Sequence, residues 1–188
     1  PPLGPMRWFR DPDYCVFKED LRYRSVRLLC VLGTTAYPLF LILDNYMLPE
    51  YLPLSAIIRG FNTLFCGTLL FLSRGGRGRL LIKYLGAFPL ILTGLGVCLV
   101  IRFMGGYQSV YYGGIAIFML LTGIAFRGPW YEIAVMNGVL FLGYFIPSFF
   151  DEIANILIFI TYTSFLFTTA AFSTVGAWGL DRNEYRSF

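Results

Sequence analysis

Acidic and basic side chains gather at one set of ends of the hydrophobic stretches in this sequence. The residues concerned are the carboxylates Asp44, Glu50, Asp151 and Glu152 and the arginines Arg59 and Arg102. Ionisable groups close to the hydrocarbon of a membrane are costly, and they usually face a partner or a cavity. Arginines suit an anionic ligand, whereas several carboxylates suit a hard cation such as Ca²⁺ or Mg²⁺. The pattern therefore indicates a binding site and not a catalytic one.

Two candidate sites follow from this grouping. For an outward-facing ligand pocket, the expected residues are Asp44, Tyr46, Arg59, Arg102 and Tyr111. For a divalent-cation site, the expected ligands are drawn from Asp44, Glu50, Asp151 and Glu152. The alternative interpretation is structural. Tyrosines at this level form an interfacial aromatic belt, and the charged residues form ion pairs that hold helix ends together.

Catalysis within this chain is not expected. The sequence has no histidine, which removes imidazole-ligated haem, His-containing zinc or di-iron sites, and Ser-His or Cys-His nucleophile pairs. The four cysteines stand singly, without C-x-x-C spacing, and are predicted to be small apolar core residues. We therefore predict no catalytic residue and no cofactor other than the possible divalent cation.

The composition is that of a membrane protein. Hydrophobic residues make up 57% of the chain and charged residues 14%, against about 25% charged in soluble domains. Six apolar stretches approach or exceed the ~20 residues that a helix needs to cross a bilayer. They cover about 26–43, 54–72, 80–101, 107–126, 130–150 and 153–178. The predicted fold is an all-α integral membrane domain of six transmembrane helices, with prolines favouring bends in alternate spans at Pro38, Pro89 and Pro147.

An amphipathic helix is predicted before the first span. Asp11 suits the N-cap and Pro12 the first helical position. Tyr14, Phe17 and Leu21 follow at spacings that place them on one face. This helix could lie on the membrane surface, pack on a partner, or remain a solvated helix that only anchors the topology. Residues 1–25 are thus predicted as an N-terminal cytoplasmic segment, 26–178 as the membrane domain and 179–188 as the start of a cytoplasmic helix.

The distribution of basic residues predicts the orientation. If both termini are cytoplasmic, 13 of the 15 Lys and Arg residues lie on the cytoplasmic side, and Arg59 and Arg102 are the exceptions. The positive-inside rule therefore places both termini in the cytoplasm of a multi-pass protein of the inner (plasma) membrane. This topology explains the net charge of +4. We therefore expect no nucleic-acid partner, and we expect membrane lipid to surround the domain.

The sixth span is rich in small and hydroxyl-bearing residues, which let helices approach closely. Ala170, Ser173, Gly176 and Ala177 are the residues predicted to form a homodimer and signalling face. The alternative is that they pack within a single six-helix bundle. The span continues into the charged, helix-compatible residues 179–188, and we expect a further cytoplasmic domain to be attached there.

Both ends of the sequence resemble a known family. Phe9-Arg10-Asp11-Pro12-Asp13, then a charged amphipathic stretch and a span that closes in Leu43-Asp44, resembles the entry to six-span membrane anchors of bacterial class III adenylate cyclases. The ending from Gly179 to Phe188 is similar to their exit into a signalling helix. The resemblance implies a dimeric membrane anchor and receptor whose sixth helix regulates a cytoplasmic nucleotide cyclase that makes cAMP. The alternatives are the sensor domain of a diguanylate cyclase or histidine kinase, or a stand-alone small transporter or channel.

Overall fold

The computed structural model describes residues 12–47, 49–74, 78–109, 111–150 and 155–187, and regular structure in these ranges is helical. The described ranges contain seven α-helices and two short 3-10 helices. In chain order they are α1 (Pro12–Met47), η2 (Pro49–Tyr51), α2 (Leu52–Leu72), α3 (Gly78–Leu85), α4 (Phe88–Phe103), η3 (Gly106–Gln108), α5 (Tyr112–Ala125), α6 (Trp130–Phe149) and α7 (Ile156–Ser187).

Several of these helices could cross a membrane. By length and hydropathy α1, α2, α6 and α7 each qualify, and α3 with α4 makes a fifth span if the bent pair counts as one. Helix α5 is apolar but has only 14 residues, which is about 21 Å of helix against a hydrocarbon thickness of about 30 Å. The prediction of an all-helical, multi-pass membrane protein is confirmed, with four to five candidate spans among the described residues.

The predicted third and fourth spans differ from the observed helices. The stretch 80–101 is two helices, because α3 ends at Leu85 and α4 starts at Phe88 with a bend of 42° between them. Pro89, in the first turn of α4, has no N–H to continue the hydrogen bonds of α3. The stretch 107–126 begins in η3 and becomes α-helical only at Tyr112. Gly105 turns the chain there with a φ of 97°, which glycine adopts without strain.

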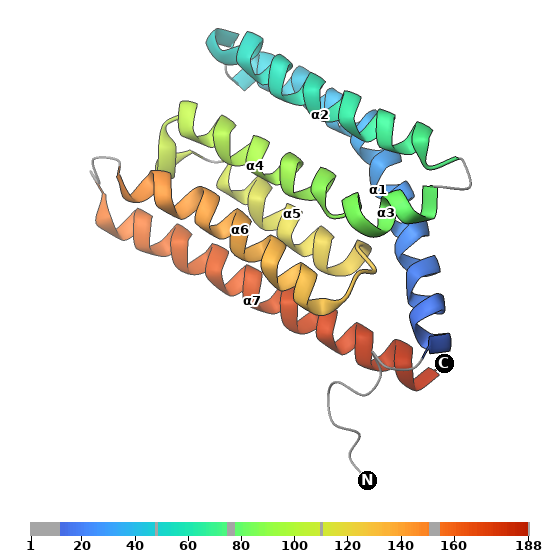
Figure 1. Cartoon of the computed structure of the whole chain (residues 1–188). Helices are drawn as coiled ribbons and strands as arrows, with labels where there is room; N and C mark the ends of the chain where they lie inside the picture. The colour runs from blue at the N-terminus through green and yellow to red at the C-terminus, as the bar shows by residue number, and fades with distance from the viewer. Residues whose placement is uncertain (1–11, 48, 75–77, 110, 151–154, 188) are drawn as a thin grey trace.

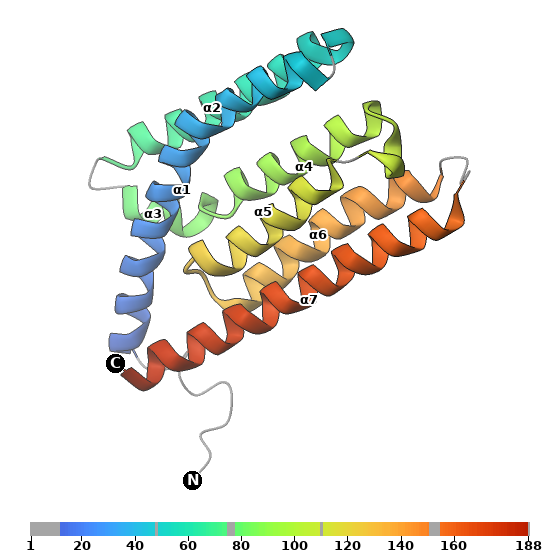
Figure 2. The same ribbon diagram turned by 180° about the vertical axis from the view of Figure 1, so that it is seen from behind.

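The predicted amphipathic helix and the predicted first span form one continuous helix of 36 residues. Figures 1 and 2 show that α1 is bent and that its first part crosses the end of the bundle where α7 finishes. Tyr14 and Phe17 of the predicted apolar face lie next to each other, with ring centroids 6.3 Å apart. Tyr14 is buried, but Phe17 is exposed, and Lys18 takes the buried position one turn after Tyr14. Ion pairs with Asp181 and Glu184 of α7 compensate the charge of the buried lysine.

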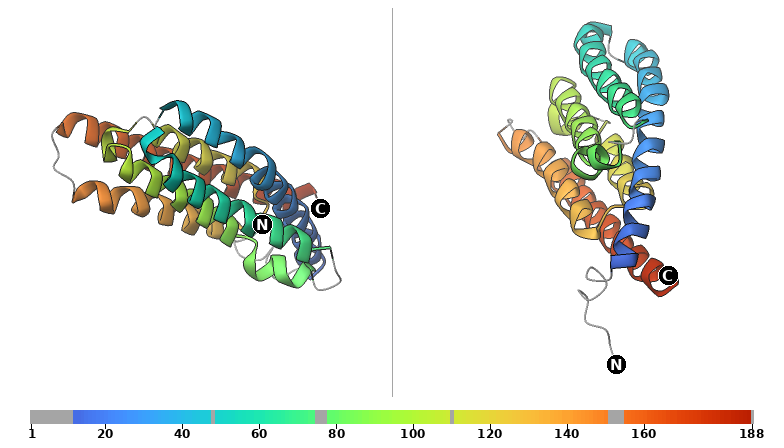
Figure 3. Two further views of the ribbon diagram at one scale, coloured as in Figure 1. Left: turned by 90° about the horizontal axis from the view of Figure 1, so that it is seen from above. Right: turned by 45° about the vertical axis from the view of Figure 1, so that its right-hand side comes forward.

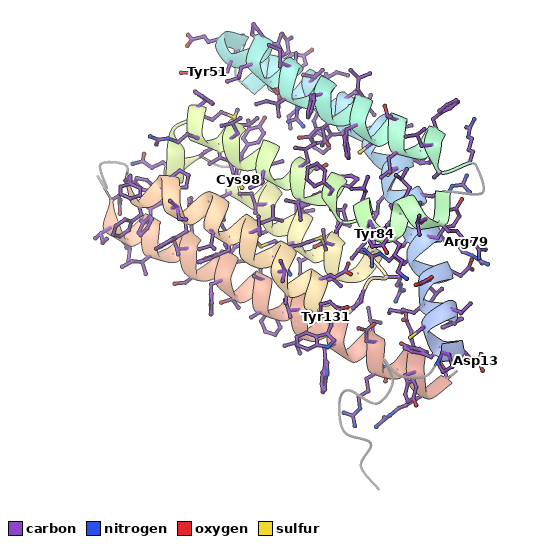
Figure 4. The ribbon with its side chains drawn as sticks, viewed as in Figure 1. Asp13, Tyr51, Arg79, Tyr84, Cys98 and Tyr131 are labelled. Atoms are coloured by element: carbon purple, nitrogen blue, oxygen red, sulfur yellow. The ribbon has the colours of Figure 1, made fainter. Side chains whose placement is uncertain are left out.

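The helices are arranged as two hairpins with α4 and α5 between them. Helices α1 and α2 form one side of the molecule and α6 and α7 the other (Figures 1 and 3). Asp13 near the start of α1 and Tyr51 before α2 lie at opposite ends of the molecule (Figure 4). We call these the terminal end, where α1 begins and α7 finishes, and the Asp44 end, where α1 turns into α2.

Two apolar clusters form the core. One joins α1, α2, α3, α4, α6 and α7 around Val26, Cys66 and Met136. The other lies within α4 to α7 around Ile115, Leu140 and Leu166. Cys30, Cys66 and Cys98 are buried, which confirms the prediction of core residues for these three, whereas Cys15 is half-buried. No disulfide joins any of the four cysteines.

Candidate functional site

Asp44 is the centre of a buried polar cluster at the Asp44 end. Its carboxylate accepts hydrogen bonds from Arg59 Nε at 2.7 Å and Arg59 Nη2 at 3.0 Å. The Ser55 hydroxyl donates to the same carboxylate, and the Tyr111 hydroxyl donates to it at 3.0 Å. Asp44, Ser55, Arg59 and Tyr111 are referred to below as the Asp44 cluster. The helices α1, α2 and the chain just before α5 therefore meet at one carboxylate.

Asp44 and Arg59 form a buried ion pair in which each residue neutralises the other. Asp44 is 1% exposed and Arg59 is 4% exposed, so each charge has been removed from bulk solvent. A buried charge is stable only when it is paired and its hydrogen bonds are satisfied. The Arg59 guanidinium also lies over the rings of Tyr37, at 4.8 Å, and Phe40, at 5.4 Å. The pair carries no net charge, so it does not offer an unbalanced cation to an anionic ligand.

The structure unites three of the five predicted ligand-site residues, namely Asp44, Arg59 and Tyr111. Tyr46 and Arg102 are exposed and lie outside the Asp44 cluster. Sequence reasoning missed Ser55 and Tyr37. The spacing of Ser55 and Arg59, four residues apart at the start of α2, puts both on one face toward Asp44 and was a usable signal.

The predicted divalent-cation site is not assembled in the described part of the chain. Glu50 is exposed in η2, and the Asp44 carboxylate is occupied by Arg59. Asp151 and Glu152 lie outside the described residues. Within the described ranges, no three His, Cys, Asp or Glu side chains gather as a metal ion would require.

A large apolar pocket begins beside the Asp44 cluster. Its volume is about 450 Å³, and its walls come from α1, α2, α4 and α5. Helix α2 packs directly on α4, where the Asn62 amide donates to Thr93 Oγ1 at 2.5 Å. Helix α1, by contrast, faces α5 across the pocket, and Figure 2 shows both helices on the same side of the molecule. Arg59 and Tyr111 line one end of the pocket.

A second polar cluster lies at the terminal end. Lys18 of α1 pairs with Asp181 and, at 2.6 Å, with Glu184, both on α7. Arg127, between α5 and α6, pairs with Glu184 at 2.8 Å. The Tyr14 hydroxyl donates to the backbone carbonyl of Asp181 at 3.3 Å. We call Tyr14, Lys18, Arg127, Asp181 and Glu184 the terminal clasp.

Sequence reasoning did not find the terminal clasp. Lys18 and Asp181 are 163 residues apart along the chain, and Arg127 and Glu184 are 57 apart, so no local spacing links them. The available signal was the presence of charged residues of both signs in two helical segments, the N-terminal amphipathic helix and residues 179–188, that were predicted on the same side of the membrane. The clasp also anchors α6, since the backbone N–H of Trp130 donates to Asp181 Oδ2 at 2.8 Å.

The predicted dimer face of α7 is mostly turned inward. Ser173 and Ala177 are buried, and the Ser173 hydroxyl donates to the backbone carbonyl of Met119 in α5 at 2.6 Å. Ala170 is half-buried and packs against the second core cluster, whereas Gly176 is exposed. Three of the four residues thus pack within this chain's own bundle, which was the alternative to a homodimer face. Dimerisation itself stays a prediction.

Helix α1 takes part in both polar clusters. Asp44 stands near its last turn and Lys18 near its first, 26 residues apart or about 39 Å along the helix axis. Comparison with protein-family models, curated proteins and solved structures found no match to this chain. Its function is therefore argued from the geometry of the two clusters and the pocket.

Proposed function

We propose that this chain is the membrane domain of a sensor, in which α1 couples the Asp44 end to the polar last turns of α7. One observation carries the proposal: a single continuous helix, α1, contributes Asp44 to one buried ion cluster and Lys18 to the other. A shift of α1 at the Asp44 end would be felt by α7 at the terminal clasp. A ligand or partner with different affinity for two positions of α1 would shift their populations.

In the proposed membrane topology the chain crosses six times, and both termini are cytoplasmic. The six crossings would be α1, α2, the bent pair α3 and α4, α5, α6 and α7. Two features support this arrangement. The first turn of α1 and the last of α7 lie together, with the rings of Tyr14 and Tyr185 5.1 Å apart, and basic residues are concentrated at that end. Reporter fusions after Phe188 test it: a cytoplasmic fluorescent reporter should be active there and a periplasmic phosphatase inactive.

The output of the sensor is proposed to be a cytoplasmic nucleotide cyclase joined to α7, acting as a dimer. Support comes from the resemblance of the two chain ends to cyclase membrane anchors and from the helical continuation of α7 through residues 179–187. Helix α7 would present its exposed face, which includes Gly176, to the second copy.

The coupling is tested with a reporter. A class III cyclase catalytic domain is joined after Phe188, and cAMP production is compared for the parent, Lys18→Met and Arg24→Met. Lys18 binds two carboxylates of α7, whereas the exposed Arg24 pairs, among the described residues, with Asp20 on its own helix. We expect Lys18→Met to change the cyclase rate several-fold and Arg24→Met to leave it unchanged. Equal rates for all three proteins at equal membrane levels would refute coupling through the clasp.

A further inference from the structure

The pocket between α1 and α5 opens toward the surface that membrane lipid would cover. Its rim carries exposed apolar side chains from both helices, among them Leu32, Phe40, Ile117 and Leu121. Its volume of about 450 Å³ falls in the range of small-molecule sites, roughly 300–1,000 Å³. A molecule would therefore enter from the hydrocarbon layer and not from water.

One end of this pocket carries hydrogen-bonding groups. Arg59 lines it and uses Nε and Nη2 for Asp44, while a guanidinium has five N–H donors in all. Tyr37 also lines the pocket and is 9% exposed, and its hydroxyl lies beside Asn62 without a well-formed hydrogen bond to any described residue. A buried hydroxyl without a partner costs free energy. A ligand oxygen at this position would remove that cost.

The charge balance at this end of the pocket determines whether a charged or an uncharged ligand group can bind there. The Asp44 carboxylate already neutralises Arg59 through two hydrogen bonds. A second carboxylate or a phosphate would be desolvated beside Asp44 without a free counter-charge. An uncharged group that accepts from Arg59 and exchanges a hydrogen bond with the Tyr37 hydroxyl meets no such penalty.

We propose that this pocket binds a single-chain, uncharged lipid, a long-chain alcohol or ketone, with its oxygen at Arg59 and Tyr37 and its hydrocarbon chain between α1 and α5. The proposal goes beyond the proposed sensor function. It concerns binding alone and stands whether or not α7 transmits a signal.

The binding is tested with the full chain in phosphatidylcholine nanodiscs. The probes are hexadecanol, hexadecanoate and hexadecane, and the readouts are saturable binding and the thermal unfolding midpoint. We expect saturable binding and a raised midpoint with hexadecanol alone. Tighter binding of hexadecanoate would overturn the uncharged head group, and equal binding of hexadecane would overturn head-group recognition. Absence of saturable hexadecanol binding would overturn the site.

Two adjacent glycines supply a matched pair of variants that locates the site. Gly114 lines the pocket, with open space beyond Val97, 3.8 Å from where a Cβ would lie. Gly113 has nothing within 4 Å of its Cβ position and does not line the pocket. We expect Gly114→Leu to weaken hexadecanol binding at least tenfold and Gly113→Leu to leave it unchanged. Equal effects of the two would place the lipid elsewhere.

The polar contact is tested by Tyr37→Phe, which removes a hydroxyl that lies beside Asn62 and makes no well-formed hydrogen bond to a described residue. Folding should therefore be preserved. We expect hexadecanol affinity to fall three- to tenfold and Gly113→Leu to retain full affinity. Unchanged affinity in Tyr37→Phe would exclude the proposed position of the head group.

Discussion

The contact between α1 and the rest of the bundle differs in kind from the contact between α5 and α7. Along its middle, α1 packs on α2 through the apolar core and faces α5 across a pocket. Polar clusters hold it near both ends. Helices α5 and α7 instead touch backbone to backbone. A Cβ added at Gly123 would lie 2.9 Å from the carbonyl oxygen and 3.2 Å from the Cα of Ser173.

The difference separates a contact that a bound molecule could alter from one that is fixed by close packing. Close packing of small residues gives a contact with one stable geometry, because interiors at crystal-like density do not deform gradually. Ion pairs and hydrogen bonds around an open pocket can be exchanged for bonds to a ligand. The α1 contact therefore suits a sensing element, and the α5–α7 contact suits a fixed scaffold.

The largest effect is expected at the Asp44 cluster. Asp44→Asn removes the charge that neutralises Arg59, whose side chain is only 5% exposed. Leaving one partner of a buried ion pair uncompensated costs about 3–5 kcal/mol. Unfolding of the purified protein in detergent should show this loss of stability.

Two controls show whether that loss belongs to the buried pair. Glu50→Gln changes an exposed carboxylate at the same end and should leave the unfolding midpoint unchanged. The double variant Asp44→Leu with Arg59→Met removes both charges and should recover much of the stability. A loss below about 1 kcal/mol in Asp44→Asn would contradict a buried pair, since exposed pairs contribute about that much or less.

A smaller effect is expected in the fixed scaffold. Gly123→Ala puts a methyl group against the backbone of Ser173, so α7 must move away. Overpacking of this kind costs typically 1–3 kcal/mol, and we expect about 2 kcal/mol in the same unfolding assay. Gly176→Ala, also in a helix but with nothing within 4 Å, is the matched control and should not destabilise. If both variants are equally stable, the α5–α7 contact is not closely packed.

Hydropathy and charge were enough to predict a helical, multi-pass membrane domain, because the signals for spans are local in the chain. Pro89 indicated a bend in the third span. The short length of α5 could not be predicted, because the apolar stretch from 107 to 126 includes residues that lie in η3. At the candidate site, the polarity of the segment ends predicted Asp44, Arg59 and Tyr111.

The partners of these residues could not be predicted in the same way. Whether Arg59 or Arg102 meets Asp44 depends on helix rotation, which depends on tertiary packing and not on spacing. The same holds for α7. Its small residues predict close approach, but they do not say whether the neighbour is α5 of the same chain, as observed for Ser173, or a second copy.

The smallest effect is expected at Tyr111, whose hydroxyl joins the start of α5 to Asp44 at one end of the pocket. Tyr111→Phe removes one hydrogen bond, and Asp44 keeps its bonds to Arg59 and Ser55. A single hydrogen bond contributes about 1 kcal/mol net, so the unfolding midpoint should fall slightly. Tyr46→Phe, on an exposed tyrosine of the same end, should have no effect. If Tyr111→Phe matched the loss in Asp44→Asn, this hydroxyl and not the ion pair would dominate the Asp44 cluster, and the contrast between an alterable α1–α5 contact and a fixed α5–α7 contact would fail.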